Sequence, residues 1–165
     1  MRRFFAPLDD ALFERLFQPL TSLLTYRFGL RRRPLACLCI DAATIGWIVA
    51  RAGGLSRVIA EGDGASAALR LVLLLLGIGA LISLRSLFRR IGDRTANPLR
   101  VAMQPHRAVI LLLLAARVLH PANGSLHEVA DLAMLLFTWA ALYLGACSEP
   151  PPVRRSASGL VGAEA

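Results

Sequence analysis

The chain has 165 residues and a net charge of +8, with 56% hydrophobic and 18% charged residues and a mean hydropathy of +0.56. Soluble domains contain about 45–50% apolar and about 25% charged residues, so this composition excludes an ordinary soluble domain. A strongly basic chain can bind nucleic acid, but no nucleic-acid-binding motif accompanies the charge here. We therefore expect one membrane domain that contacts anionic lipid headgroups and binds no nucleic acid.

The N-terminal arm, residues 1–34, contains a four-residue leucine repeat that is typical of an amphipathic helix. The repeated positions are Leu8, Leu12, Leu16 and Leu20. Pro7 and Pro19 predict the two ends of a helix of about 12 residues, because proline fits the first turn of a helix and disrupts its interior. Such a helix either lies in the membrane interface or docks on the inner surface of its own domain or on a partner.

Four apolar segments follow the arm. They cover about 35–52, 65–87, 101–119 and 126–147. Four such runs leave too little polar surface to solvate a soluble bundle. We therefore predict an all-α domain, residues 35–147, in which four transmembrane helices cross the bilayer in up-down-up-down order.

The connections between these segments are short. Residues 53–64 are rich in glycine and predict a small outer loop, and residues 120–125 predict a tight turn. Ser125 and Glu128 have the spacing of a capping box at the start of the fourth helix. The tail, residues 148–165, is rich in Pro, Ser, Gly and Ala and predicts a disordered cytoplasmic segment.

The arginines alternate from one side of the apolar segments to the other. Fifteen of the nineteen lie before the first segment, between the second and third or in the ends of those two segments that flank this connection, or after the fourth: Arg2, Arg3, Arg15, Arg27, Arg31, Arg32, Arg33, Arg85, Arg89, Arg90, Arg94, Arg100, Arg107, Arg154 and Arg155. The other four are Arg51, Arg57, Arg70 and Arg117. Because cytoplasmic loops carry an excess of basic residues, both termini are predicted to be cytoplasmic. The asymmetry and the small size favour a bacterial inner membrane.

Asp41 places a carboxylate inside the first apolar segment, about 10 Å along the helix at 1.5 Å per residue. An unpaired charge at such depth costs about 2.5–3.5 kcal/mol. We therefore expect an ion pair with Arg85 or Arg107, which approach from the same side of the membrane. The alternative is a proton or cation site. A lone acidic residue in the first of four helices resembles, in outline, the small four-helix multidrug exporters, although the aromatic lining of that family is missing.

Arg117 and Asp131 are the second candidate charge pair. They stand at similar distances from the predicted turn at 120–125, on antiparallel segments. They can therefore meet and clamp the hairpin, or Arg117 can instead reach Glu128.

Small residues recur every four positions in the first segment. They are Ala42, Gly46, Ala50 and Gly54. This spacing places them on one stripe of a helix, where another helix backbone can approach closely. The stripe serves either packing within the monomer or self-association.

No catalytic or cofactor-binding set is visible. Cys37 and Cys39 lie about 200° apart around a helix, so they cannot both face one metal ion, and Cys147 is also expected near the reducing cytoplasm, where disulfides are rare. We predict no enzyme activity, no cofactor and no metal. The leading expectation is a small structural or accessory multi-pass membrane protein that associates with itself or with another membrane protein. The alternative is a small oligomeric transporter or pore, coupled to protons or cations, that uses Asp41.

Overall fold

The computed structural model describes residues 2–29, 31–90, 99–119 and 124–147. Within these ranges the chain forms α-helices, one π-helical turn and short connections, with no β-strand. The predicted all-α class is therefore confirmed. Most of the predicted turn at 120–125, and the predicted tail at 148–165, lie outside the described residues.

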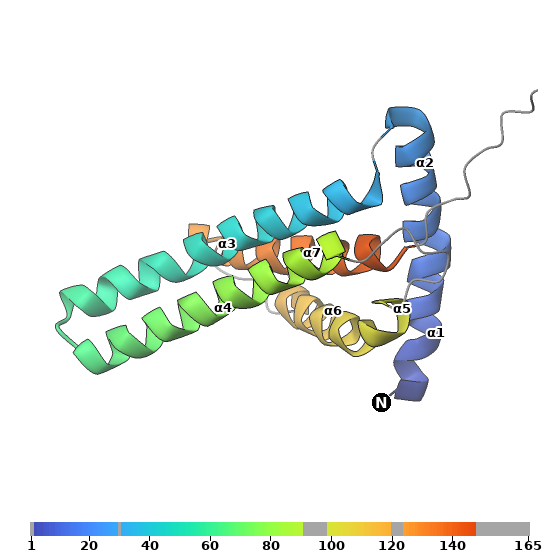
Figure 1. The fold of residues 1–165 in the computed structure, drawn as a ribbon. Helices are drawn as coiled ribbons and strands as arrows, with labels where there is room; N and C mark the ends of the chain where they lie inside the picture. The colour runs from blue at the N-terminus through green and yellow to red at the C-terminus, as the bar shows by residue number, and fades with distance from the viewer. Residues whose placement is uncertain (1, 30, 91–98, 120–123, 148–165) are drawn as a thin grey trace, which may run out of the picture.

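Four helices lie alongside one another as a bundle (Figure 1). They are α3 (Arg32–Ala60), α4 (Gly64–Arg90), α6 (Gln104–Leu119) and α7 (Leu126–Ala146), with a short helix α5 (Leu99–Ala102) before α6. Helices α3, α4 and α7 are long and apolar enough to cross a membrane. Helix α6 has 16 residues and extends about 24 Å, less than the hydrocarbon core of about 30 Å. Among the described helices, three of the four predicted crossings therefore have sufficient length.

Helices α3 and α4 pack against each other in antiparallel directions. The indole Nε1 of Trp47 donates a hydrogen bond of 3.1 Å to the carbonyl of Leu74. Arg70, earlier in α4, donates one of 3.1 Å to the carbonyl of Gly54, later in α3. The later residue of α3 thus contacts the earlier residue of α4, so the two helices are antiparallel.

Helix α3 also packs along α7, and glycines of α3 allow the two backbones to come close. A side chain at Gly46 would meet the carbonyl oxygen of Ala130 at 3.0 Å and the Cβ of Met134 at 3.1 Å. The imidazole of His127 fills the space that a side chain at Gly53 would need. This contact places α3 at the centre of the bundle, between α4 and α7, while α6 packs on α7.

The predicted outer loop at 53–64 is mostly helical, which corrects the sequence-based expectation. Helix α3 continues to Ala60, because its glycines serve helix packing and do not interrupt the backbone. The turn into α4 is tight. Gly62 has a φ of +77°, a left-handed conformation that favours glycine. The carboxylate of Asp63 then caps α4 by accepting bonds of 3.1 Å and 2.6 Å from the backbone N–H and hydroxyl of Ser66.

The N-terminal residues form a helical rod that lies across the end of the bundle (Figure 1). The rod consists of α1 (Arg2–Leu12), the π-helical turn η1 (Phe13–Phe17) and α2 (Gln18–Phe28). The predicted helix ends at Pro7 and Pro19 are both wrong, because the rod begins at Arg2 and continues through both prolines. Proline cannot donate a helical hydrogen bond, and the rod widens directly before Pro19, where the N–H of Gln18 bonds to the carbonyl of Phe13 five residues back.

Two neighbouring stripes of this rod have different surroundings. The inner stripe is buried against the bundle and consists of Asp9, Phe13, Phe17 and Thr21. The leucine stripe is exposed and consists of Leu8, Leu16, Leu20 and Leu23. Docking on the chain's own bundle is therefore confirmed for the inner stripe. Contact of the leucine stripe with the membrane interface stays a prediction.

Candidate functional site

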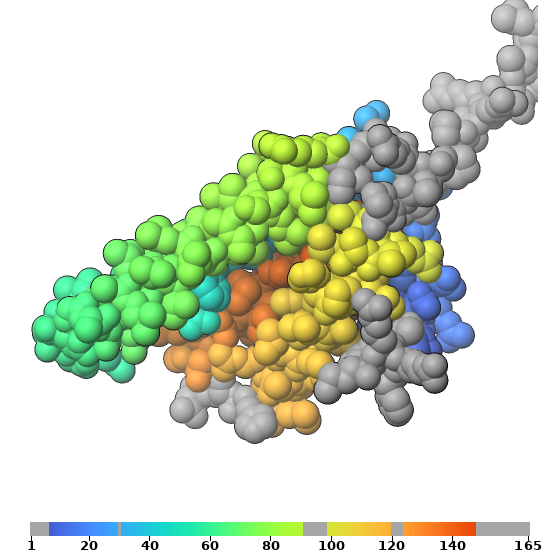
Figure 2. Space-filling view, turned by 60° about the horizontal axis from the view of Figure 1, so that its bottom comes forward, coloured from blue at the N-terminus to red at the C-terminus, as the bar shows by residue number. Residues whose placement is uncertain are grey.

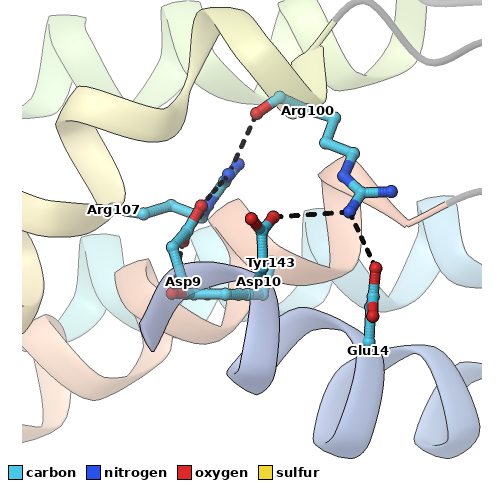
Figure 3. Close-up of polar contacts among 6 residues, drawn as sticks. All are labelled: Asp9, Asp10, Glu14, Arg100, Arg107 and Tyr143. Atoms are coloured by element: carbon cyan, nitrogen blue, oxygen red, sulfur yellow. Dashed lines mark hydrogen bonds and ion pairs between the residues drawn. The ribbon is translucent and has the colours of Figure 1, made fainter. Parts of the chain in front are cut away.

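The most deeply buried ion pair in the described chain lies where the rod meets the bundle (Figure 3). Arg107 comes from the first turns of α6, and its side chain is 1% exposed. Asp9 comes from α1, and its side chain is 9% exposed. Arg107 donates from Nε to Oδ1 of Asp9 at 2.9 Å and from Nη2 to Oδ2 at 2.6 Å. This bidentate contact fixes the orientation of the guanidinium relative to the carboxylate as well as the distance between them.

Two further hydrogen bonds complete the cluster. The hydroxyl of Tyr143, from α7, donates to Oδ1 of Asp9 at 2.7 Å. Nη2 of Arg107 also donates to the carbonyl of Arg100, in α5, at 2.9 Å. The cluster therefore joins α1 and α7, from near the two ends of the described chain, to the consecutive helices α5 and α6, and its two opposite charges neutralise each other.

The ionised form of Asp9 is the favoured one. Burial alone would raise the pKa of this carboxyl, but hydrogen bonds from Arg107 and Tyr143 and the charges of Arg107 and Arg100 outweigh burial and hold the pKa below its ordinary value of 3.8. Asp9 thus remains charged throughout the neutral range and keeps the guanidinium compensated.

Aromatic rings surround the cluster on one side. The ring of Phe17 stacks on Tyr143 with centroids 4.6 Å apart and an interplanar angle of 18°. Trp139 packs edge-on against both rings, at 5.1 Å from Phe17 and 5.3 Å from Tyr143. These contacts hold the phenol in place and limit the access of water to the ion pair.

A second arginine fastens the outer side of the rod. The guanidinium of Arg100 lies 4.4 Å from the ring centroid of Phe13, 3.3 Å from Glu14 Oε1 and 3.5 Å from Asp10 Oδ1. All three charged side chains are largely exposed. An exposed ion pair contributes at most about 1 kcal/mol to stability. We therefore assign most of the stabilisation between the rod and the bundle to the buried pair of Asp9 and Arg107.

The structure brings Asp41 together with one of its two expected partners. Nε and Nη2 of Arg85 lie 2.8 Å and 2.9 Å from the two carboxylate oxygens of Asp41. The side chain of Asp41 is 43% exposed and that of Arg85 is 34% exposed. The pair therefore lies on the side of α3 and α4 and not in the middle of the bundle. Arg107, the other expected partner, pairs with Asp9 instead.

The second expected pair also meets, with an additional partner. Arg117 of α6 contacts Asp131 of α7 in a short ion pair, and Arg51 of α3 lies 3.5 Å from the other oxygen of Asp131. The Asp131 side chain is mostly buried, and the two arginines are about half exposed. The pair was predicted from the hairpin, whereas Arg51 was missed because it comes from a third helix.

The predicted small-residue stripe does not lie against one common partner. Gly46 faces α7, and Gly54 lies beside the guanidinium of Arg70 in α4. Ala42 and Ala50 are partly buried. At the two glycines the space is therefore filled by the chain's own helices, as the packing interpretation expects.

Sequence reasoning missed Asp9 and Tyr143. Asp9 lies within the predicted amphipathic helix and Tyr143 within the apolar segment at 126–147, and neither was singled out as a charge partner. The available signal was the inner stripe itself: Asp9, Phe13 and Phe17 share a four-residue spacing one position after the leucines.

The arrangement can hold helices together but carries no visible reactive set. No group of three metal-ligating side chains exists among the described residues. Comparisons with family models, curated proteins and solved structures find no match to this chain. The function must therefore be argued from the geometry alone.

We predict that Asp9→Asn releases the N-terminal rod. The substitution leaves the Arg107 guanidinium buried without a counter-charge, which costs about 3–5 kcal/mol. Hydrogen–deuterium exchange of the amides in residues 8–28 should rise strongly. The matched control is Asp10→Asn, one residue along and exposed, which should change stability by less than about 1 kcal/mol. Equal effects of the two variants would contradict the assignment.

The same pair predicts an acid transition. Because the pKa of Asp9 in the folded protein lies below its ordinary value of 3.8, its contribution to stability is present above pH 3.8. The contribution is lost as the pH falls from there through the lowered pKa. Exchange of the rod amides should therefore increase at pH below 3.8 in the native chain, and Asp9→Asn should lack this step.

We predict that Asp41 and Arg85 stabilise the protein as a pair. Asp41→Asn and Arg85→Gln each leave one charge without its partner, whereas the double variant removes both. Thermal unfolding in detergent should show a coupling of about 0.5–3 kcal/mol between the two sites. A transport role predicts a different result: Asp41→Asn would abolish proton-linked flux in vesicles and leave stability unchanged.

Proposed function

We propose that this chain is a multi-pass membrane protein with four crossings, in which α6 is the fourth and the N-terminal rod lies along the cytoplasmic surface. We further propose that it acts as a structural or accessory subunit that associates with itself or with another membrane protein. The observation that carries the proposal is the exposure of α4. Its long apolar stretch contains no fully buried residue, because the rest of the chain covers it only in part.

The pairing of α6 supports its role as a fourth crossing. Helix α6 contacts α7 near both of its ends. At its start, Arg107 lies over the ring of Tyr143, and near its end, Arg117 forms an ion pair with Asp131. A helix that runs along most of a membrane-crossing neighbour spans a similar depth. A short helix can be accommodated by local thinning of the bilayer and by flanking residues that reach the headgroups.

The position of the rod supports the proposed orientation. It lies across the end of the bundle at which α3 and α6 begin and α4 and α7 end (Figure 1). The same end carries Arg32, Arg89 and Arg100. Basic residues concentrate on the cytoplasmic side, and a helix parallel to that surface would present its leucine stripe to the lipid interface. Anionic headgroups are the complementary lipid partner, and a bacterial inner membrane is the proposed location.

The outer face of α4 supports association with another helix. A Cβ added at Gly79 meets no atom within 4 Å, and Ser83, one turn later, is exposed. Small residues at this spacing let a second backbone approach closely in a membrane, where apolar surface alone gives no preference for protein over lipid. The pairing of Asp41 with Arg85 is evidence against a free coupling carboxylate, so transport is not the function that the geometry favours.

We predict the topology from reporter fusions in cells. Fusions after Ala60 and Ser125 should report the outer side, and a fusion after Thr95 should report the cytoplasm. The reason is that these sites follow α3, precede α7 and follow α4 respectively. A cytoplasmic signal after Ser125 would remove α6 as a crossing and leave three.

We predict that gentle detergent extraction yields a defined complex much larger than the 17.8 kDa chain with its micelle. Gly79→Leu should reduce its size, because a bulky side chain at Gly79 keeps a second backbone at a distance. The matched control is Ala115→Leu on the exposed face of α6, which should leave the size unchanged. A monodisperse monomer from the native chain would contradict the proposal.

A further inference from the structure

A groove of about 700 Å³ lies between α4 and α6 and has α7 as its floor. Figure 2 shows α4 in green on one side, α6 in yellow on the other, and the orange of α7 between them. Leu84 and Leu87 line the wall of α4, Val109 and Ile110 line that of α6, and Leu142 contributes to the floor. The volume lies within the range of about 300–1,000 Å³ that is common for small-molecule sites.

The hydroxyl groups that border this groove are already hydrogen-bonded within their own helices. Ser83 donates to the carbonyl of Gly79 at 2.7 Å, and Ser86 donates to that of Ser83 at 2.8 Å. Thr138 donates to the carbonyl of Met134 at 2.8 Å. The groove therefore presents mainly hydrocarbon along its length and suits an apolar chain.

Among the described residues that line the groove, Arg90, the last residue of α4, is the charged one. His106, in the first turn of α6, also lines the groove, and its imidazole can donate a hydrogen bond. No carboxylate is among the lining residues. Arg90 is exposed, so its guanidinium remains available to a phosphate, which it can bind through paired N–H groups.

The length of the groove distinguishes a lipid from a helix. Its wall on α4 runs from Ala80 to Arg90, a rise of about 15 Å at 1.5 Å per residue. This is half of the hydrocarbon core of about 30 Å, which is the depth of one leaflet. A partner helix that crosses the whole membrane would need a longer groove, whereas one acyl chain of the inner leaflet needs no more than this depth.

We propose that the groove binds one anionic phospholipid of the cytoplasmic leaflet, with an acyl chain between α4 and α6 and the headgroup phosphate beside Arg90 and His106. The proposal depends on the membrane function proposed above. It adds a specific lipid site to general contact with headgroups, because the apolar walls and the cationic border belong to one cavity.

The test uses the purified full chain in mild detergent and native mass spectrometry with added phosphatidylglycerol or phosphatidylcholine of identical acyl chains. The native chain should bind phosphatidylglycerol about tenfold more tightly, which corresponds to about 1.4 kcal/mol. Arg90→Gln should lower that affinity to the value for phosphatidylcholine. Arg89→Gln is the matched control, since it removes the same charge from an adjacent residue that does not line the groove.

A second pair of variants tests the acyl-chain part of the site. Ser83→Phe fills the groove and should weaken binding of both lipids, whereas Ile82→Phe, at an exposed neighbour outside the groove, should not. If Ser83→Phe fails to fold, the comparison of Arg90→Gln with Arg89→Gln still decides the proposal.

Three results would overturn the proposal. The first is equal binding of the two lipids with no effect of Arg90→Gln. The second is binding of glycerol phosphate as tight as that of the intact lipid. The third is a lipid-free dimer that Ser83→Phe dissociates and Gly79→Leu leaves intact, which would make the groove, which Ser83 lines and Gly79 does not, an interface between two copies. The reporter fusions measure membrane topology separately, so loss of lipid binding in a correctly inserted protein refutes only this site.

Discussion

The buried guanidinium of Arg107 is the constraint on which the rest of this structure depends. A charge that is 1% exposed needs a carboxylate at short range, because removal of either partner leaves an uncompensated charge that costs several kcal/mol. The only residue that fills this role in the described chain is Asp9. The N-terminal rod must therefore lie across the end of the bundle, and Tyr143 must point its hydroxyl toward the same carboxylate.

This one contact determines the orientation of the rod about its own axis. With Asp9, Phe13 and Phe17 directed inward, the leucine stripe (Leu8, Leu16, Leu20 and Leu23) is left on the outside. Exposed leucines on an amphipathic helix are the side chains that a membrane interface would cover, as proposed above. The same rod thus packs on the end of the bundle with one stripe and leaves the other exposed.

Much of the fold, but less of the site, could be predicted from the sequence. Long apolar runs gave the helical class, and the spacing of Ser125 and Glu128 predicted a capping box that the structure confirms. Counting residues along the predicted helices placed Arg85 and Arg107 at the depth of Asp41 and left both as possible partners, and the structure pairs Asp41 with Arg85. The counting failed for Arg107, because Asp9 belongs to a separate rod whose placement depends on tertiary contacts. The glycines at 53 and 54 were misread as a loop, since close packing against His127 and Arg70 is not visible in the sequence.

The ion pairs show which charged side chains of the described chain are already neutralised by a partner. Asp41 is neutralised by Arg85, Asp131 by Arg117 and Arg51, and Asp9 by Arg107. Each pair joins different helices, so the charge within the bundle is used for cohesion. The border of the lateral groove differs, because Arg90 and His106 face a cavity that no acidic side chain of the described chain lines. An occupant that is negative at one end and apolar along its length would complement a groove with apolar walls and an arginine at its border. The lateral groove, and not the centre of the bundle, is therefore where the charge of this chain is left for a ligand, as proposed above.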